Sequence, residues 1–329
     1  MTRRIQDVTR FPGELKGGVV AIGNFDGVHR GHQAVLAQAL DAARAESLPA
    51  SVLTFEPHPR TVFRPDEPVF RITPAPMKAT ILGHLGFDAV VEQAFNRAFS
   101  SQSAEDFVSG ILCNCFGVRH VITGYDFHFG KGREGNPDYL MQAGERHGFS
   151  VTLVEQFSDE GGDVVSSSRI REALAAGDVS EAAGLLGYRY AVAAEVTDGK
   201  KLGRTLGYPT ANMALPPETS LMPGIYAIRF RRENGVLYDG VASFGRRPTV
   251  DEDGAALLLE TFLFDFSGDL YGETCTVSLV SYLRGEEKFD GLDPLVAQMK
   301  ADEAQARAVL AGIKPLSPLD STLTFETVT

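Results

Sequence analysis

Two histidines three residues apart follow a glycine-bearing turn near the amino-terminal end of the sequence. Residues 17–32 read GGVVAIGNFDGVHRGH, which indicates a buried strand, a tight turn and a helix that begins close to His32. A strand that leads into a helix N-terminus offers free N–H groups and the helix dipole to an anion. His29 and His32 can lie on one side and reach the same phosphates. The residues alone also allow a zinc site, or histidines that only cap and pack.

A second glycine-bearing segment occurs at residues 198–212, which read DGKKLGRTLGYPTAN. Glycines allow the backbone to close on phosphates, and Thr210 and Asn212 offer oxygen atoms that suit a hard cation. The residues alone allow a surface hairpin loop equally well.

A single carboxylate interrupts the apolar run LLLETFLF at residues 257–264. Strand alternation places Glu260 on the same face as Leu258, Phe262 and Phe264. A carboxylate on a buried apolar face is costly unless it is paired or functional. Glu260 is therefore a candidate base, and an arginine partner is the structural alternative.

Three further segments carry groups that can contact a nucleotide or an aromatic ligand. Residues 166–171 read SSSRIR at a helix start, where hydroxyls, N–H groups and Arg171 favour an anion, although an ordinary helix cap is the alternative. Residues 54–59 read TFEPHP and leave a strand at the same sheet edge as the first turn, with prolines that favour an extended loop. Residues 124–130 read GYDFHFG after another strand. These two loops could also be a rigid turn and a packed aromatic loop.

Alternating strands and helices must position the first group of residues. We expect strands at 19–22, 51–55, 89–92, 120–123 and 150–155, and helices at 32–46, 77–85, 103–112, 138–146 and 168–176. Short apolar strands joined by helices predict a doubly wound, Rossmann-like α/β domain with a parallel sheet. A short helix ending at Gly187 places the domain boundary there, so this domain spans residues 1–186.

Residues 187–329 change to strand periodicity. We expect strands at 190–196, 224–231, 237–244, 257–266 and 273–283, without helices between them. Successive strands without crossovers predict an antiparallel β-barrel. A C-terminal helix at 294–310 can cover one face of the barrel, although Asp302 and Glu303 interrupt its apolar stripe.

Composition narrows the class of protein. The 329 residues carry a formal net charge of −12, which argues against a nucleic-acid partner. No signal-like segment or long apolar run is present, so we expect no membrane partner and a cytoplasmic location. Cys113, Cys115 and Cys275 are expected to be reduced thiols, with a metal site at the first two as the alternative. The sequence leaves the oligomeric state open.

The string G-x-F-D-G-V-H-x-G-H resembles the nucleotidylyltransferase signature of bacterial bifunctional riboflavin kinase/FAD synthetases. The loops at 54–59 and 124–130 fit that family in order, and GRTLGYPTAN resembles its riboflavin kinase loop. The resemblance covers residues 15–310. Ser168 stands where the family usually has threonine, and Ser243 where many relatives have asparagine.

The resemblance implies two reactions. Riboflavin is phosphorylated by ATP to FMN, with Glu260 accepting the proton of the attacking hydroxyl. FMN then attacks the α-phosphorus of a second ATP, which gives FAD and pyrophosphate, and this reaction needs charge stabilisation rather than a base. Mg²⁺ is implied with ATP. An enzyme with one degenerate site is disfavoured because both motif sets keep their reactive groups. A passive flavin-binding regulator or carrier is disfavoured because it would not need Glu260 together with Thr210 and Asn212.

The resemblance also implies a role for each site residue. The catalytic residues are Glu260, His29 and His32. The ATP- and phosphate-binding residues are Gly23, Phe25, Asp26, Gly27, Gly31, Ser167, Ser168, Arg171, Gly203, Arg204, Gly207 and Pro209. The flavin-binding residues are Phe55, His58, Asp126, Phe127, Phe129 and Arg284, and the metal ligands are Thr210 and Asn212.

Overall fold

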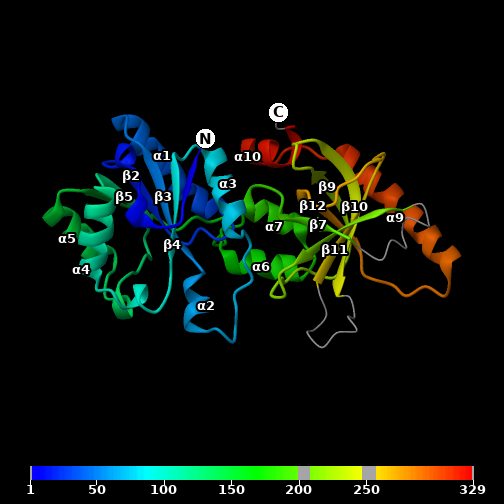
Figure 1. Cartoon of the computed structure of the whole chain (residues 1–329), viewed down its shortest axis with the longest axis horizontal. Helices are drawn as coiled ribbons and strands as arrows, with labels where there is room; N and C mark the ends of the chain where they lie inside the picture. The colour runs from blue at the N-terminus through cyan, green and yellow to red at the C-terminus, as the bar shows by residue number, and fades with distance from the viewer. Residues whose placement is uncertain (1, 199–207, 247–256, 328–329) are drawn as a thin grey trace. The chain divides into compact units, whose positions relative to one another are not determined.

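A computed structural model describes residues 2–198, 208–246 and 257–327. The chain divides into two compact units, Met1–Ser166 and Ser167–Thr329. Figure 1 shows a sheet with helices in the first unit and a barrel in the second. None of the helices formed by the described residues combines the length and the apolar composition required to cross a bilayer.

The first unit contains a six-stranded sheet in the order β1-β4-β3-β2-β5-β6, and every neighbouring pair is parallel. Its strands are β1 (Arg3–Ile5), β2 (Val19–Ile22), β3 (Ala50–Glu56), β4 (Ala89–Ala94), β5 (His120–Gly124) and β6 (Ser150–Val154). The chain passes from β2 to β3 and β4 on one side and later to β5 and β6 on the other. The strand order therefore reverses between β2 and β5, where ligands bind in open α/β sheets.

Helices cover both faces of this sheet. All four residues of β2 are buried, although successive strand residues point to opposite faces. α1 (Arg30–Glu46) packs on β2, β3 and β5, and α3 (Ala75–Leu85) packs on β4. A core cluster joins η4 (Phe107–Phe116) and α5 (Pro137–His147) to the sheet. The predicted doubly wound α/β fold is confirmed.

Short helices complete the first unit. They are η1 (Val8–Arg10), η2 (Gly13–Leu15), α2 (Pro59–Phe63), η3 (Phe99–Ser101), α4 (Ala104–Asp106) and η5 (Lys131–Arg133). Ser103 caps α4 through a capping box with Asp106, as its position before an apolar run predicts. The helical segment then continues to Phe116, beyond the predicted end at residue 112. The prolines of residues 54–59 do not give an extended loop throughout, because Pro59 begins α2.

The second unit begins with α6 (Ser167–Ala175) and α7 (Val179–Leu186) and continues into a closed barrel. Its strands are β7 (Ala191–Thr197), β8 (Thr210–Leu215), β9 (Gly224–Arg231), β10 (Leu237–Arg246), β11 (Leu257–Leu263) and β12 (Thr274–Arg284). Each strand is antiparallel to both neighbours in the order β10-β11-β8-β7-β12-β9. The predicted antiparallel barrel is confirmed, but β8 and β1 were not among the expected strands.

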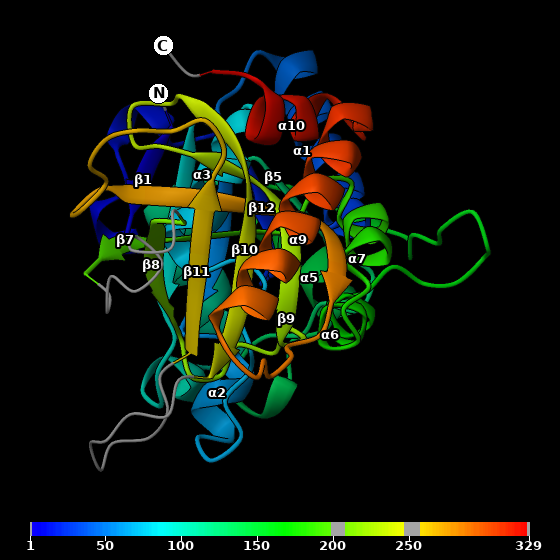
Figure 2. The same cartoon turned by 90° about the vertical axis from the view of Figure 1, so that its right-hand side faces the viewer.

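A long helix, α9 (Leu292–Gly312), covers part of the outer face of the barrel (Figure 2). Its buried residues Ala306 and Leu310 pack with Ala227 of β9 and Phe264, which follows β11. Asp302 does not interrupt the helix. It is 4% exposed and accepts hydrogen bonds from Arg284 of β12, so a charge partner replaces apolar packing at this position.

The C-terminal segment is anchored to the barrel unit by charged side chains. α10 (Pro318–Asp320) and η6 (Ser321–Phe325) form this segment. Arg189 forms a buried ion pair with Asp320, and the backbone N–H of Arg189 also donates to Asp320 at 2.9 Å. Arg231 donates to the carbonyl oxygens of residues 322 and 323.

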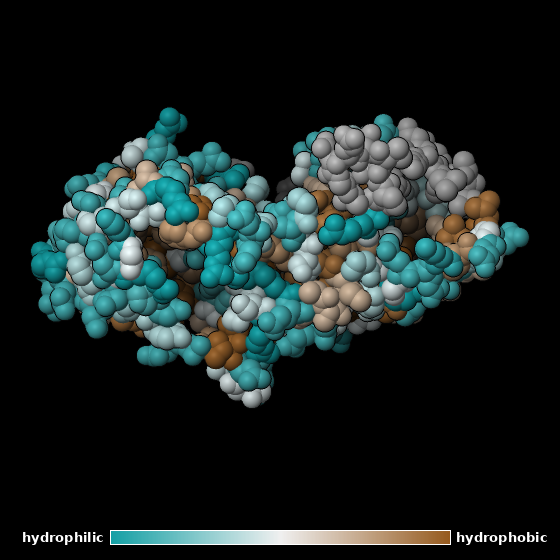
Figure 3. All heavy atoms as spheres, turned by 90° about the horizontal axis from the view of Figure 1, so that it is seen from below, coloured by the Kyte–Doolittle hydropathy of each residue, from teal (hydrophilic) through white to brown (hydrophobic). Residues whose placement is uncertain are grey.

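Large apolar side chains at the surface are dispersed among the described residues. On the face seen in Figure 3, hydrophilic residues surround small, separate apolar patches. The exposed large apolar residues are Phe63, Tyr125, Met141, Val164, Met222, Val236, Tyr271, Leu292 and Leu316.

Two candidate active sites

The turn between β2 and α1 has an unusual backbone. Phe25 and Val28 have φ angles of 48° and 40°, in the left-handed region that bulky residues rarely adopt. The Phe25 ring folds back over Gly23, where an added Cβ would lie 2.9 Å from the ring. A side chain at position 23 would therefore displace Phe25 from the turn. Gly23 and Phe25, both predicted site residues, therefore lie in contact, and Phe25 is buried.

The two histidines of the turn stack on each other. Their ring centroids lie 3.6 Å apart with an interplanar angle of 19°. His29 is the N-cap of α1, and its Nδ1 accepts a hydrogen bond from the backbone N–H of His32 at 3.3 Å. A neutral His29 therefore carries its hydrogen on Nε2. Among the described residues, no hydrogen-bond partner meets the buried Nδ1 of His32.

Burial and the neighbouring charges of His29 and Lys78 hold the pKa of His32 well below its ordinary value. His32 is therefore neutral at pH 7. The rings of Phe25 and His32 also pack edge to face, with their centroids 5.4 Å apart. Packing thus fixes the orientation of the His32 ring.

A later segment of the same unit lies against the start of α1. An added Cβ at Gly31 would lie 3.2 Å from the His29 ring and 3.4 Å from the carbonyl oxygen of Val165. Arg30 forms an ion pair with Glu160 and lies over the ring of Phe157, at 5.2 Å from its centroid. Residues 157–165 therefore pass beside the histidine pair.

Asp26 holds the turn to another segment. Its carboxylate is buried and accepts the backbone N–H groups of Ile72 and Thr73 at 3.3 and 3.1 Å. The backbone N–H of Gly27 donates to Thr73 Oγ1 at 2.8 Å. These contacts show that Asp26 holds the turn against residues 72 and 73. The phosphate contact implied for Asp26 stays a prediction.

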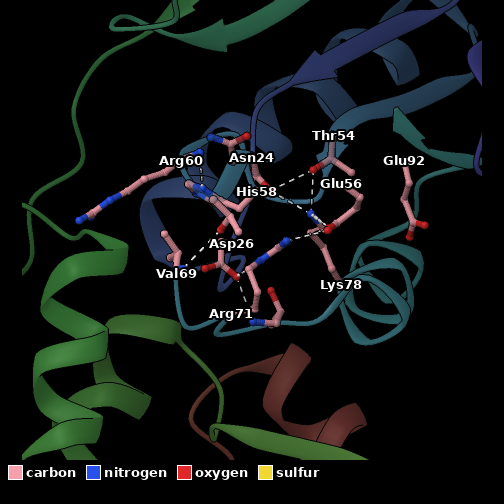
Figure 4. Close-up of polar contacts among 12 residues, drawn as sticks. Asn24, Asp26, Thr54, Glu56, His58, Arg60, Val69, Arg71, Lys78 and Glu92 are labelled. Atoms are coloured by element: carbon pink, nitrogen blue, oxygen red, sulfur yellow. Dashed lines mark hydrogen bonds and ion pairs between the residues drawn. The ribbon is translucent and has the colours of Figure 1, made fainter. Parts of the chain in front are cut away.

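A polar cluster beneath this turn was not identified from the sequence (Figure 4). It contains Thr54, Glu56, Arg71 and Lys78. A signal for Lys78 did exist, because it shares the spacing i, i+3, i+4 with the buried residues Ile81 and Leu82. A lysine on the buried stripe of a helix indicates a specific partner for its charge.

Two loops that leave neighbouring strands carry the aromatic residues predicted to contact flavin. Phe127 and Phe129 follow β5 and stack with centroids 5.4 Å apart. Phe129 is buried against Phe107, whereas Phe127 is only partly buried. Phe55 at the end of β3 is buried between Phe95 and Phe99. Core packing therefore accounts for Phe129 and Phe55, and Phe127 has the more accessible ring.

Of the polar residues predicted in the same loops to contact flavin, Asp126 is exposed and His58 is half-buried. Asp126 is exposed after β5, and its carboxylate lies over Gly124, 3.2 Å from where a Cβ would stand. His58 caps α2 by accepting the N–H of Arg60 at 3.2 Å. Both residues leave carboxyl ends of strands in the same parallel sheet, as the sequence predicts.

Ser167, Ser168 and Arg171 occupy the first turn and a half of α6. This helix is the first element of the second compact unit, although the sequence places it in the first domain. Ser168 is exposed, and Ser167 and Arg171 are half-buried. Their phosphate contacts remain predictions.

A row of polar side chains crosses the barrel. Asn212 on β8 is the direct cross-strand partner of Glu260 on β11, which in turn is opposite Ser243 on β10. Thr197 on β7 is opposite Asn212 and donates to its carbonyl oxygen at 3.3 Å. Opposed residues of antiparallel strands point to the same face, so these side chains share one side of the sheet.

The structure corrects the expected environment of Glu260. On β11 the buried residues are Leu257, Leu259, Thr261 and Leu263, and the residues between them, including Glu260, are half-buried. Glu260 shares a face with Phe262, as predicted, but this is the outer face of the barrel. Alternation identified the residues that share a face, and it did not specify which face is inside.

Asn212 offers an oxygen atom suited to a cation. Its side chain is 5% exposed, and within the described ranges its Oδ1 has no hydrogen-bond partner. Thr210 lies two residues away on the same face of β8, so both predicted ligands belong to a strand and not to a loop. No three His, Cys, Asp or Glu side chains of the described residues are grouped to hold a metal ion.

The remaining predicted residues of the second site are placed as follows. Gly203, Arg204 and Gly207 lie outside the described residues. Pro209 is exposed directly before β8. Arg284 binds Asp302 of α9 through two hydrogen bonds of 2.8 and 2.6 Å, so its guanidinium anchors the helix. Its flavin contact stays a prediction.

A Rossmann-like unit with a histidine-bearing turn at its switch point is followed in the chain by an antiparallel barrel whose polar row contains one carboxylate, Glu260. This is the architecture of a two-domain enzyme. Two family models match the chain, one described as FAD synthetase over residues 12–169 and one as riboflavin kinase over residues 186–310. The chain belongs to the family of bifunctional riboflavin kinases/FMN adenylyltransferases.

Individual relatives agree over nearly the whole chain. The bifunctional riboflavin kinase/FMN adenylyltransferase of Escherichia coli (strain K12) is 39% identical, over 96% of this chain and 99% of its own. The Pseudomonas fluorescens enzyme of the same name is 43% identical, over 91% and 94%. A crystal structure from Streptococcus pneumoniae described as a macrolide-efflux protein is 32% identical, with a TM-score of 0.81 over 93% of this chain and 98% of that chain.

These matches confirm the main sequence-based predictions. The chain is an enzyme of flavin-cofactor synthesis with riboflavin kinase and FMN adenylyltransferase activities. Riboflavin, FMN and FAD are its substrates and products.

Proposed function

We propose that the two reactions use two separate sites, one at the His29 and His32 turn and one at the Glu260 and Asn212 row. The observation that carries this proposal is where the two groups of residues lie in the chain. Each group lies in a different compact unit and within a different family-model match. The functional boundary at residues 186/187 is part of the proposal, because the riboflavin kinase match begins at residue 186.

Adenylyl transfer at the first site depends on positioned donors. The FMN phosphate is already ionised, so the site must align it with ATP and stabilise charge on the departing pyrophosphate. His29 can donate from Nε2 because its Nδ1 is occupied by the N–H of His32. The backbone N–H groups at the start of α1 add further donors. Ser167, Ser168 and Arg171 are proposed as further phosphate-binding residues on the sequence pattern SSSRIR alone.

Riboflavin phosphorylation at the second site needs a base, because its nucleophile is a neutral hydroxyl. Glu260 is the single carboxylate in the cross-strand row of Thr197, Asn212, Glu260 and Ser243. Its side chain is half-buried and therefore accessible to a substrate. The accepted proton would reside on a Glu260 carboxylate oxygen while the hydroxyl oxygen attacks the γ-phosphorus of ATP.

Mg²⁺ is proposed to enter the second site with ATP. Asn212 Oδ1 and the Thr210 hydroxyl would hold it, and the buried Oδ1 without a partner in the described residues fits an oxygen-preferring cation. When bound, the ion supplies neutralisation of the phosphate charge. We also propose a cytoplasmic protein with no nucleic-acid or membrane partner, which the net charge of −12 supports.

A time course tests the two-site proposal. Wild-type protein given riboflavin and Mg-ATP should form FMN transiently and then FAD. His32→Ala should lower FAD formation from supplied FMN by at least about 100-fold, the effect of removing a charge-stabilising donor. The same variant should keep riboflavin phosphorylation within about twofold, because residues without shared partners act independently and His32 lies in the other compact unit from Glu260 and Asn212. Joint loss of both activities in a folded variant would indicate one composite site.

A further inference from the structure

Lys78 of α3 is a fully buried cation with a complete set of partners. Its side chain is 0% exposed. Its Nζ donates to the carbonyl oxygen of Asn24 at 3.1 Å and to Thr54 Oγ1 at 2.8 Å, and it lies 2.8 Å from Glu56 Oε1 (Figure 4). Three partners match the three hydrogens of an ammonium group. Lys78 therefore has no hydrogen left for a substrate phosphate.

The charge of Lys78 belongs to a group of four charged side chains, of which Lys78 and Asp26 are buried and Glu56 and Arg71 are half-buried. Glu56 also binds Arg71 through two hydrogen bonds of 2.6 and 2.7 Å. Arg71 Nε lies 3.6 Å from Asp26 Oδ1. Two carboxylates and two cations balance each other, and the pKa of Glu56 is lowered by these two cations although burial acts against them. Burial of these charges costs desolvation free energy, and an apolar residue at position 78 would pack on the buried side of α3 without that cost.

The cluster acts on the turn that carries the histidines. The carbonyl oxygen of Asn24 accepts two hydrogen bonds, one from Lys78 Nζ and one from the Thr54 hydroxyl at 3.0 Å. Two residues later Asp26 is held by the N–H groups of residues 72 and 73. Between and beyond these anchors lie the left-handed residues Phe25 and Val28, a backbone that persists only where its surroundings fix it.

We propose that Lys78 and Thr54 are positioning residues for adenylyl transfer. They hold the Asn24 carbonyl, and thereby fix the turn that presents the His29 and His32 rings to the phosphates. This inference rests on the proposed function of the first site. Neither residue touches the reacting atoms.

Thr54→Val tests the inference with little change of volume. The hydroxyl is lost from a fully buried side chain, and both of its hydrogen bonds go with it. FMN adenylylation should lose at least about tenfold in kcat/KM, since small misplacement of donors is costly. Riboflavin phosphorylation should stay within about twofold. Thr54→Ser retains the hydroxyl and should restore most of the adenylylation.

Thr123→Val is the matched control. Thr123 is also buried, at the end of β5, and its hydroxyl donates at 3.0 Å to the carbonyl oxygen of Ile22, before the turn begins. This variant loses an equivalent hydrogen bond without releasing Asn24. Its adenylylation should fall much less than that of Thr54→Val.

Lys78→Met adds a readout that a purely structural role would not change. Burial is the main cause of the lowered pKa of His32, and the charges of His29 and Lys78 lower it further, so removal of the Lys78 charge should move the acidic limb of the adenylylation pH profile to higher pH. An unmoved limb counts against the positioning role. The inference is overturned if Thr54→Val loses no more adenylylation than Thr123→Val. If wild-type protein makes no FAD from FMN, the proposed function fails instead, which separates the two results.

Discussion

Glu260 and Asn212 are direct cross-strand partners on β11 and β8, and their side chains lie on the outer face of the barrel. Side chains in such a pair begin about 5 Å apart. This spacing would let Glu260, as the proposed proton acceptor, and Asn212, as the proposed cation ligand, act on one bound nucleotide and one hydroxyl. Strand pairing brings together two residues that are distant in the sequence.

Glu260→Gln should abolish most riboflavin phosphorylation. The amide keeps the shape of the side chain but cannot accept the hydroxyl proton, and loss of a general base costs about 100-fold to 10,000-fold in kcat. FMN adenylylation by the same protein is the internal control and should be unchanged. Steady-state assays with each substrate measure both. Kinase turnover within about threefold of wild type would exclude Glu260 as the base.

Asn212→Leu should raise the Mg²⁺ concentration required for half-maximal riboflavin phosphorylation by about tenfold or more, because it removes the proposed cation ligand. Thr261→Val is the control. Thr261 Oγ1 is also buried without a partner in the described structure, but it points to the barrel interior. Its substitution should leave the Mg²⁺ titration unchanged. Equal shifts in the two variants would argue against an Asn212 ligand.

The sequence indicates which residues carry reactive groups better than it indicates their surroundings. His29, His32 and Glu260 stand out because reactive groups follow glycines or interrupt an apolar strand. Lys78 was missed because one lysine in an apolar helix gives no indication of partners at Asn24 and Thr54, which lie on other elements. Local patterns identify reactive residues, whereas their partners depend on tertiary contacts.

The barrel shows the same limit. Thr210–Leu215 was assigned partly to a loop, since Pro209 and the preceding glycines indicate a turn. Pairing with β11 and β7 makes it a strand. Likewise, Asp302 reads as an interruption of α9 until Arg284 on β12 is seen to pair with it. Long-range pairing determines both features.

Asp302→Ala should destabilise the barrel unit by about 3 kcal/mol, because it leaves the Arg284 guanidinium without its buried partner. Glu303→Ala is the neighbouring control. Glu303 pairs with Arg307, whose side chain is 42% exposed, so its loss should cost less than about 1 kcal/mol. Urea unfolding, followed by circular dichroism, compares the variants. Equal losses would show that Arg284 finds another partner.

The pH dependence of stability should report His32. Its pKa in the folded protein lies well below the value of 6.5 that an unfolded chain has, with burial as the main cause. As pH falls through 6.5, the unfolded chain gains a proton that the folded protein does not, so the free energy of unfolding falls.

His32→Gln removes this titration. The free energy of unfolding of the variant should therefore fall less than that of wild type between pH 7.5 and pH 5.5, with a difference in slope of at most about 1.4 kcal/mol per pH unit, and its melting temperature should fall less accordingly. Between about pH 7.5 and 8.5 the histidine is neutral in both states, so the two curves should run parallel. Thermal unfolding at a series of pH values measures both ranges. Curves that stay parallel down to pH 5.5 would mean that folding leaves the pKa of His32 unchanged.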